Sequence, residues 1–269
     1  ATDDSPPTVP KAEILRPVVP AFELADNLPT LTPEETRFTP TASFQTEEAV
    51  DLTSASAVDL AFNSSNPDEW SSDLSWEAFE YVTPADNQYR IKIDPSNYGD
   101  RYAEDVSGNP VQNEILVVLH ETTSSAESAV HTFLTHHPDG ANQVSYHALI
   151  LLDGRIVHLV PPEKRAYGAG NSEFRSDQGV EAVQTNPQYP SSVNNFAYHI
   201  SLETPLDAQN RSVESHSGYS LEQYKSLSWL IRELQVDASR VTTHKAVDRG
   251  QERADPRSFD MAYLASMMY

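Results

Sequence analysis

The sequence predicts an α/β fold in which helices flank a central mixed β-sheet, preceded by an acidic N-terminal segment. Three observations predict this fold. From about residue 89 onward, apolar and partly β-branched runs alternate with stretches of helical periodicity. An Asp-Gly pair separates two of the runs, which is typical of a hairpin between antiparallel strands. The order strand, helix, hairpin, strand, helix favours a mixed sheet covered by helices.

The first half of the predicted sheet surrounds one helix. The continuous apolar run 115–119 indicates a strand that is buried on both faces. Apolar residues then recur at helical spacing over 126–134, behind Ser124 or Ser125 as the N-cap. Strands over 144–152 and 156–160 follow, joined through the Asp-Gly turn.

The second half of the predicted fold adds a strand and a longer helix. Residues 197–202 form another strand candidate, and a short β-prone run covers 241–243. The last helix carries an apolar stripe over 221–234. Ser220 precedes this helix and Gln223 stands three residues later, which is the pattern of a capping box.

The chain divides into two regions of different composition. Residues 1–85 are rich in Pro, Ser, Thr and acidic side chains, with almost no Lys or Arg. Such a segment buries too little apolar surface to offset its chain entropy, so we expect an acidic, partly extended tail or linker. Short apolar patches at 14–15 and 70–79 are candidates for docking on the folded part. Residues 86–269 form the predicted globular domain.

Charge and composition exclude several classes of partner and site. The formal net charge of −22 disfavours nucleic acids and anionic membranes, because both would be repelled. No apolar run approaches the roughly 20 residues that span a bilayer. The chain has no cysteine, so His, Asp or Glu must hold any metal. The start at Ala1 favours an exported mature protein, and we expect a monomer.

Three residues are candidate metal ligands. His120 directly follows the first strand, His244 follows the run 241–243, and Asp255 stands eleven residues later. Two imidazoles and one carboxylate leave a tetrahedral zinc ion with one open position, which is typical of a catalytic metal. Taken singly, each has a more ordinary interpretation: a structural or surface histidine, or an aspartate that begins a turn before proline.

Two further residues are candidate catalytic groups. Glu203 ends the strand candidate 197–202, and a carboxylate there would serve as general base if that strand lies beside the one ending in His120. The alternative is a solvated acid at a strand end. Tyr146 and His147 point to opposite faces of their strand, so only one enters the site. A phenol near a metal donates to a developing oxyanion, although a strand tyrosine is more often packing.

Taken together, these motifs resemble the type 2 N-acetylmuramoyl-L-alanine amidase family, to which peptidoglycan recognition proteins also belong. The resemblance covers roughly residues 112–260 and rests on the order of the motifs. They are Val118-Leu119-His120-Glu121-Thr122, Ser145-Tyr146-His147, the Asp153-Gly154 hairpin leading to Leu159-Val160-Pro161, Ile200-Ser201-Leu202-Glu203, Thr243-His244, and Asp255-Pro256.

The resemblance implies the fold of that family and a Zn²⁺-dependent hydrolase of the periplasm or the cell exterior. Its substrate would be peptidoglycan or a muropeptide, cut at the amide bond between N-acetylmuramic acid and L-alanine. Arg253, two residues before Asp255, would stabilise the oxyanion, and Tyr146 matches a tyrosine implicated in some members. The resemblance makes Glu203 the catalytic carboxylate and the following residues the zinc ligands: His120, His244 and Asp255.

The sequence also departs from the family pattern. Arg257 follows Asp255-Pro256 where glycine is usual, residues 165–170 replace a Trp-His type of pair, and an insertion over about 171–195 is loop-like in composition. Two alternatives stay open. One is a recognition module of the same fold that binds muropeptides without cutting them, and the other is an enclosed, purely structural metal.

Overall fold

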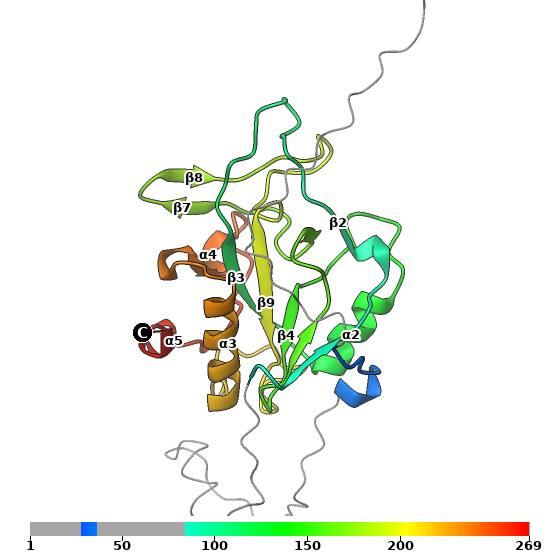
Figure 1. Cartoon of the computed structure of the whole chain (residues 1–269), viewed down its shortest axis with the longest axis vertical. Helices are drawn as coiled ribbons and strands as arrows, with labels where there is room; N and C mark the ends of the chain where they lie inside the picture. The colour runs from blue at the N-terminus through cyan, green and yellow to red at the C-terminus, as the bar shows by residue number, and fades with distance from the viewer. Residues whose placement is uncertain (1–27, 37–83, 269) are drawn as a thin grey trace, which may run out of the picture.

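The computed structural model describes residues 28–36 and 84–268, and its centre is a six-stranded mixed β-sheet (Figure 1). Only β4–β5 is an antiparallel pair, and the other neighbours run parallel. In spatial order the strands are β1 (Gln88–Arg90), β5 (Ile156–His158), β4 (Ala148–Ile150), β9 (Ala197–Leu202), β3 (Leu116–Glu121) and β10 (Val241–Thr243).

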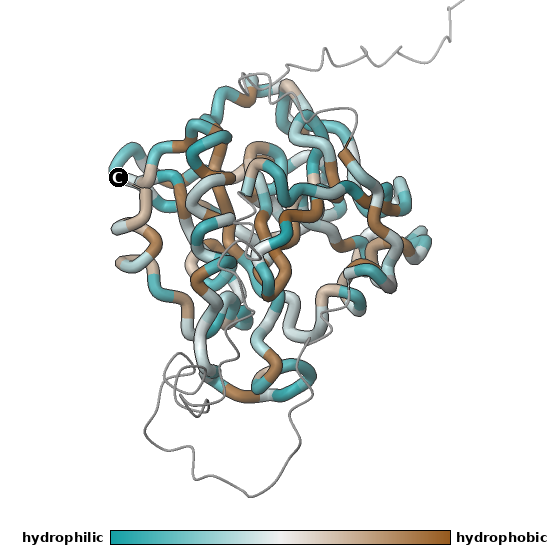
Figure 2. Tube along the Cα trace, turned by 60° about the horizontal axis from the view of Figure 1, so that its bottom comes forward, coloured by the Kyte–Doolittle hydropathy of each residue, from teal (hydrophilic) through white to brown (hydrophobic). Residues whose placement is uncertain are grey.

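Helices cover both faces of this sheet. On one face, α3 (Leu221–Glu233) and α5 (Met261–Met268) pack on side chains such as Val117, Leu119 and Ile200. On the other face, α2 (Ala126–Leu134) packs on Leu149 and Val157. The two helices α2 and α3 lie on opposite sides of the central strands (Figure 1). Hydrophobic residues gather along the inner segments of the trace, while the periphery is mostly hydrophilic (Figure 2). The predicted mixed sheet with flanking helices is therefore confirmed.

Local sequence signals predicted the main elements closely. Ser125 is the N-cap of α2, and its side chain accepts a hydrogen bond from the backbone of Ser128. Ser220 and Gln223 form the complete capping box of α3. The hairpin strands β4 and β5 are shorter than the predicted ranges, so Tyr146 and His147 precede β4 instead of lying within it.

Smaller elements complete the fold. One two-stranded sheet pairs β2 (Tyr98–Asp100) with β6 (Lys164–Ala166), and another pairs β7 (Phe174–Ser176) with β8 (Gly179–Glu181). The second sheet lies inside the insertion 171–195, so the expectation of an irregular loop there is wrong in part. The remaining short helices are η4 (Pro95–Asn97), η5 (Ala238–Arg240) and α4 (His244–Val247).

Part of the predicted tail lies against the domain. The segment 28–36 includes η1 (Glu34–Thr36), which lies beside α2 (Figure 1). Arg90 of β1 donates its backbone N–H to Pro29 and accepts one from Leu31, whose side chain packs on the α2 core. The rest of the predicted tail, including the apolar patches at 14–15 and 70–79, lies outside the described residues. The division at residue 85 stays a prediction.

Within the described part of the chain, each helix is too short or too polar to cross a bilayer.

Candidate metal centre

The register of β3 and β9 decides which side chains surround His120. The strands are parallel, and His120 lies opposite Ser201. Because side chains alternate along a strand, the inward turn of Leu119 toward α3 sends His120 to the other face. His199 and Ser201 of β9 point to that same face. All three side chains are completely buried.

His244 reaches the same place through β10. This strand pairs with β3 so that Thr243 lies opposite Leu119, and His244 begins α4 directly afterwards. The Thr243 hydroxyl caps α4 by accepting a hydrogen bond from Ala246. The His120 and His244 rings therefore lie with their centroids 4.6 Å apart.

Asp255 completes the group. Its Oδ2 lies 3.0 Å from Nδ1 of His244 and 3.3 Å from Nδ1 of His120. The three potential ligand atoms all lie within 4.8 Å of one another. The structure thus brings together the three residues that the sequence singled out as metal ligands, and we call them the His-His-Asp cluster.

Burial sets the charges of the His-His-Asp cluster. Loss of solvation lowers the pKa of His120 to about 4. Burial alone would raise the pKa of Asp255, but its contacts with the ring nitrogens of His120 and His244 hold that pKa below its ordinary value. At neutral pH a neutral His120 imidazole therefore faces an ionised carboxylate, which are the protonation states that a metal ion requires.

A buried ion pair joins the two chain segments that carry His120 and Asp255. Glu121 follows His120, Arg257 lies two residues beyond Asp255, and both are buried. The Arg257 guanidinium donates from Nε to Oε1 of Glu121 at 2.5 Å and from Nη2 to Oε2 at 3.2 Å. This contact gives Arg257 a structural reason where the family pattern has glycine: it ties the Asp255 loop to the end of β3.

Tyr146 and Arg253 lie beside the cluster. The Tyr146 ring contacts that of His120, with centroids 4.6 Å apart. Together with His244, Tyr146 and Arg253 line a cavity of about 620 Å³, whose other walls include Tyr167, Tyr189 and Asn186. Burial raises the pKa of the Tyr146 phenol, so this group stays protonated at neutral pH and is available as a hydrogen-bond donor.

Glu203 follows β9 as expected, but its hydrogen bonds lead away from the His-His-Asp cluster. Its strand does lie beside β3, as the expected role required, and Glu203 stands beyond the end of β9. There Oε1 accepts the backbone N–H of Ala126 at 2.9 Å, and Oε2 accepts that of Leu152 at 3.1 Å. The carboxylate links the start of α2 to the end of β4. None of its hydrogen bonds among the described residues reaches the cluster, so the general-base role stays a prediction without geometric support.

Sequence reasoning missed His199. Its Nδ1 lies 2.9 Å from Nε2 of His120, on the ring edge opposite Asp255. The two histidines are 79 residues apart, and only the register of β3 and β9 brings them together. The one signal in the sequence is a histidine within an apolar strand pattern, which a core packing role explains equally well.

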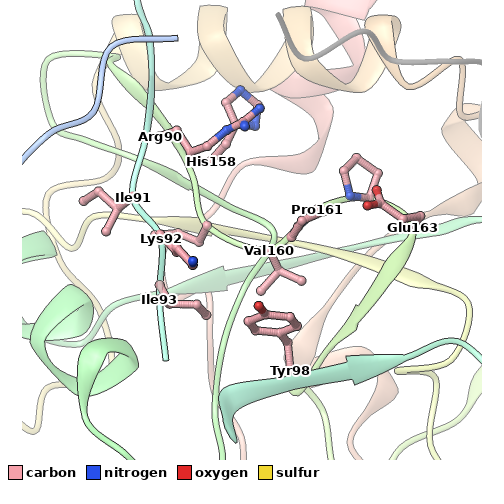
Figure 3. A pocket seen from close by; sticks show the side chains of 11 residues that line it. Arg90, Ile91, Lys92, Ile93, Tyr98, His158, Val160, Pro161 and Glu163 are labelled. Atoms are coloured by element: carbon pink, nitrogen blue, oxygen red, sulfur yellow. The ribbon is translucent and has the colours of Figure 1, made fainter. Parts of the chain in front are cut away.

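A second cavity lies away from the cluster. It has a volume of about 430 Å³ and is formed by residues 90–93 and 158–163. Figure 3 shows Arg90 beside His158, Pro161 and Glu163 across from them, and Tyr98 below. Arg90 and Lys92 give it positive charge, and Glu163 opposes them. None of the three cluster residues lines this cavity, so the 620 Å³ cavity is the candidate active site.

One family model and several solved structures are similar to this chain. A family model described as N-acetylmuramoyl-L-alanine amidase matches residues 109–258. A selenomethionine derivative of AmpD has a TM-score of 0.47 and 23% identity, covering 68% of this chain and 95% of that chain. AmpD from Citrobacter freundii has a TM-score of 0.41 and 24% identity, covering 67% and 90%. AmiD from E. coli, in complex with the substrate anhydro-N-acetylmuramic acid-L-Ala-D-gamma-Glu-L-Lys, has a TM-score of 0.43 and 21% identity, covering 60% and 62%. No curated protein matches this chain.

Proposed function

The chain belongs to the N-acetylmuramoyl-L-alanine amidase family, and we propose that it performs this reaction with a zinc ion held by His120, His244 and Asp255. The bond cut joins N-acetylmuramic acid to the L-alanine of the stem peptide. One observation carries the zinc proposal: the approach of two ring nitrogens to a single carboxylate oxygen at the wall of the large cavity.

The donor set fits zinc in chemistry, and the two separations from Asp255 Oδ2 fit the bond lengths of zinc. Zinc takes imidazole nitrogen and carboxylate oxygen at about 2.0–2.2 Å, so two ligands at a tetrahedral angle lie roughly 3.3 Å apart. The observed separations from Asp255 Oδ2 are 3.0 and 3.3 Å. The buried Nδ1 of His120 makes no hydrogen bond with any described residue, as expected of a lone pair reserved for a cation.

A set of three protein ligands favours a catalytic metal over a structural one. When bound, zinc would supply Lewis-acid chemistry, polarising the amide carbonyl and activating water for attack. Within residues 28–36 and 84–268, the metal-binding group contains three residues and no fourth His, Asp or Glu. An enclosed structural site normally has four protein ligands.

The side chains around the cavity have separate roles in the proposed reaction. The protonated Tyr146 phenol and the Arg253 guanidinium donate to the carbonyl oxygen as negative charge develops on it. Asp255 remains ionised and balances the charge of the metal. The cavity is large enough for the part of a muropeptide around the cut bond.

A digestion of purified peptidoglycan, with and without a metal chelator, tests the proposed function. We expect new L-alanine amino termini, detected by mass spectrometry of the products, that chelator abolishes and added zinc restores. Binding of muropeptides without cleavage would instead favour the recognition module. Full cleavage by chelated, metal-free protein would exclude a catalytic metal.

We further propose that the protein acts in the periplasm or outside the cell, where this polymer lies. Fractionation of the source cells with an antibody against the chain tests the location. Recovery of the protein only from the cytoplasm would contradict it.

A further inference from the structure

We propose that His199 is a positioning residue that accepts a hydrogen bond from Nε2 of His120 and so aims Nδ1 of His120 at the metal. This inference rests on the proposed function, because it assigns His199 a purpose only if His120 is a ligand. His199 itself touches neither the carboxylate of the cluster nor its other imidazole through any hydrogen bond among the described residues.

The contact fixes which nitrogen of His120 carries the proton. Nδ1 of His120 lies 3.3 Å from Asp255 and makes no hydrogen bond, while Nε2 lies 2.9 Å from Nδ1 of His199. A neutral imidazole that ligates through Nδ1 must hold its proton on Nε2. Nε2 therefore donates, and His199 Nδ1 accepts. Ligating histidines are commonly oriented by such a bond on the second nitrogen.

The surroundings hold the His199 ring in place. Its backbone N–H donates to Nδ1 of His147 at 2.9 Å, and the two rings stack with centroids 5.9 Å apart. On the other side, a Cβ at Gly168 would come within 2.5 Å of His199 Nδ1. Glycine at 168 therefore leaves the room that this ring needs, and the ring has little freedom to turn away.

The remaining nitrogen of His199 indicates that the arrangement costs stability. Because Nδ1 accepts, the proton of His199 lies on Nε2. This buried atom has no hydrogen-bond partner in the described part of the chain. A buried donor without a hydrogen-bond partner destabilises the folded state. Leucine would fill the same space without that cost, so the histidine is explained by its bond to His120 and not by packing.

Three variants of His199 distinguish a role as hydrogen-bond acceptor for His120 from a role in packing alone. His199→Leu keeps the bulk and removes the acceptor. His199→Asn places an amide oxygen where Nδ1 stood, and His199→Gln places its amide one bond farther away. His158→Leu is the matched control, since it removes another buried strand histidine that hydrogen-bonds Gln88 instead of the cluster. Circular dichroism and thermal unfolding of the metal-free proteins establish that each variant folds.

The readout is zinc affinity, measured by competition with a chromophoric chelator and independent of enzymatic activity. We expect His199→Leu and His199→Gln to bind zinc roughly 10–100-fold more weakly, as for other partners of metal-bound histidines. His199→Asn and His158→Leu should stay close to the unaltered protein. Since Asn and Gln differ only in reach, the comparison holds even if the leucine variant fails to fold.

The possible failures are distinguishable. If the unaltered protein binds no zinc, the proposed metal centre is wrong and this inference falls with it. If the unaltered protein binds zinc but His199→Leu and His199→Gln bind it equally well, only the role of His199 is overturned. Equal weakening in the Asn and Gln variants would also overturn that role, because a general packing defect would then explain the loss.

Discussion

At the scale of single residues, burial decides the protonation states on which the proposed chemistry depends. Loss of solvation keeps the pKa of His120 low and that of Tyr146 high. Both groups are therefore neutral near pH 7, one as a nitrogen ligand and the other as an O–H donor. Asp255, in contrast, stays charged, because the two ring nitrogens beside it outweigh the effect of its burial.

The Tyr146 hydroxyl gives the first prediction. Tyr146→Phe keeps the ring against His120 and Phe133 but removes the donor. Removal of one oxyanion donor typically lowers kcat by about 10²–10³-fold, and we expect a loss of that order with unchanged zinc affinity. Steady-state kinetics on a soluble muropeptide measure the loss. Tyr198→Phe, a buried tyrosine on the other face of β9, is the control. A fully active Tyr146→Phe enzyme would exclude the phenol from the reaction.

Glu203 gives the second prediction. Glu203→Gln replaces one acceptor oxygen by an NH₂ group, so the backbone N–H of Ala126 or Leu152 loses its partner. A buried donor left unpaired costs about 1–3 kcal/mol, and we expect a fall of that size in the free energy of unfolding, measured in urea. Activity per folded molecule should be kept. Normal stability with activity reduced more than about 100-fold would instead establish the general base. Glu222→Gln, on exposed α3 surface, is the control.

Some residues of the candidate site could be predicted from the sequence and others could not. The His-His-Asp cluster was predictable from the order of its motifs along the chain, although His120 lies within β3 and not after its end. The position of Glu203 was not, since strand alternation gives its face but not its distance along the strand. Ser201 lies opposite His120 in the pairing of β9 with β3. Glu203 lies two residues after Ser201, so its Cα is about 6.6 Å farther along the chain than the level of His120. His199 was hidden for a related reason, because its partner is set by register.

At the scale of elements, the ion pair of Glu121 and Arg257 joins β3 to the segment before α5. Arg257 also donates to the backbone carbonyls of Arg211 and Val213, so the loop before α3 is held as well. Tyr219 donates its hydroxyl to Glu121. Three separate pieces of chain therefore meet at one buried carboxylate, directly beside a proposed zinc ligand.

Loss of one partner of this pair gives the third prediction. Glu121→Gln leaves the Arg257 charge buried without a counter-ion, and breaking such a pair costs about 3–5 kcal/mol. We expect a fall of that order in the free energy of unfolding of the metal-free protein, measured in urea. Arg249→Gln, which breaks a more exposed pair with Glu173, should cost much less. Equal losses in both variants would show that burial does not make the Glu121 pair special.

Elements differ in how far local sequence determines them. The start of α3 was predictable because Ser220 and Gln223 satisfy each other within four residues. The strand β1 was not, since Gln88–Arg90 carries no apolar alternation and its partners, β5 and the bridge at Thr30, are distant in sequence. The hairpin β7–β8 is similar: Val180 is exposed, and Phe174 alone joins a core cluster. The pattern of apolar residues within these strands does not reveal them, because β1 forms by pairing with distant segments and β7–β8 by pairing across a turn.

At the scale of the whole molecule, the interior of this acidic protein contains several neutral histidines. The net charge is −22, yet four of the nine histidines are both buried and held at a lowered pKa: His120, His147, His158 and His199. Three of them lie on or beside the face of the sheet that carries the cluster. The folded state is therefore most favourable at a pH at which these four imidazoles are uncharged.

This arrangement gives the fourth prediction, a loss of stability in mild acid. Burial lowers the pKa of His120 to about 4 and that of His158 to about 3, against about 6.5 in the unfolded chain. Between these values the unfolded chain binds more protons than the folded one, so the free energy of unfolding falls as pH falls below 6.5. Each such histidine contributes up to about 1.4 kcal/mol per pH unit. Glu203, whose pKa burial raises, opposes this trend because its folded form holds a proton longer.

Urea unfolding of the metal-free protein between pH 7.5 and 5 measures this dependence, since removal of zinc excludes competition between protons and metal. His158→Gln should make the pH dependence shallower without touching the cluster, because one proton fewer is then taken up on unfolding. His131→Gln, an exposed position on α2, should leave the slope unchanged. A stability that is flat or rises toward pH 5 would mean that the buried imidazoles are solvated or charged in the folded protein. The conclusion that His120 is a neutral imidazole ligand would then also be wrong.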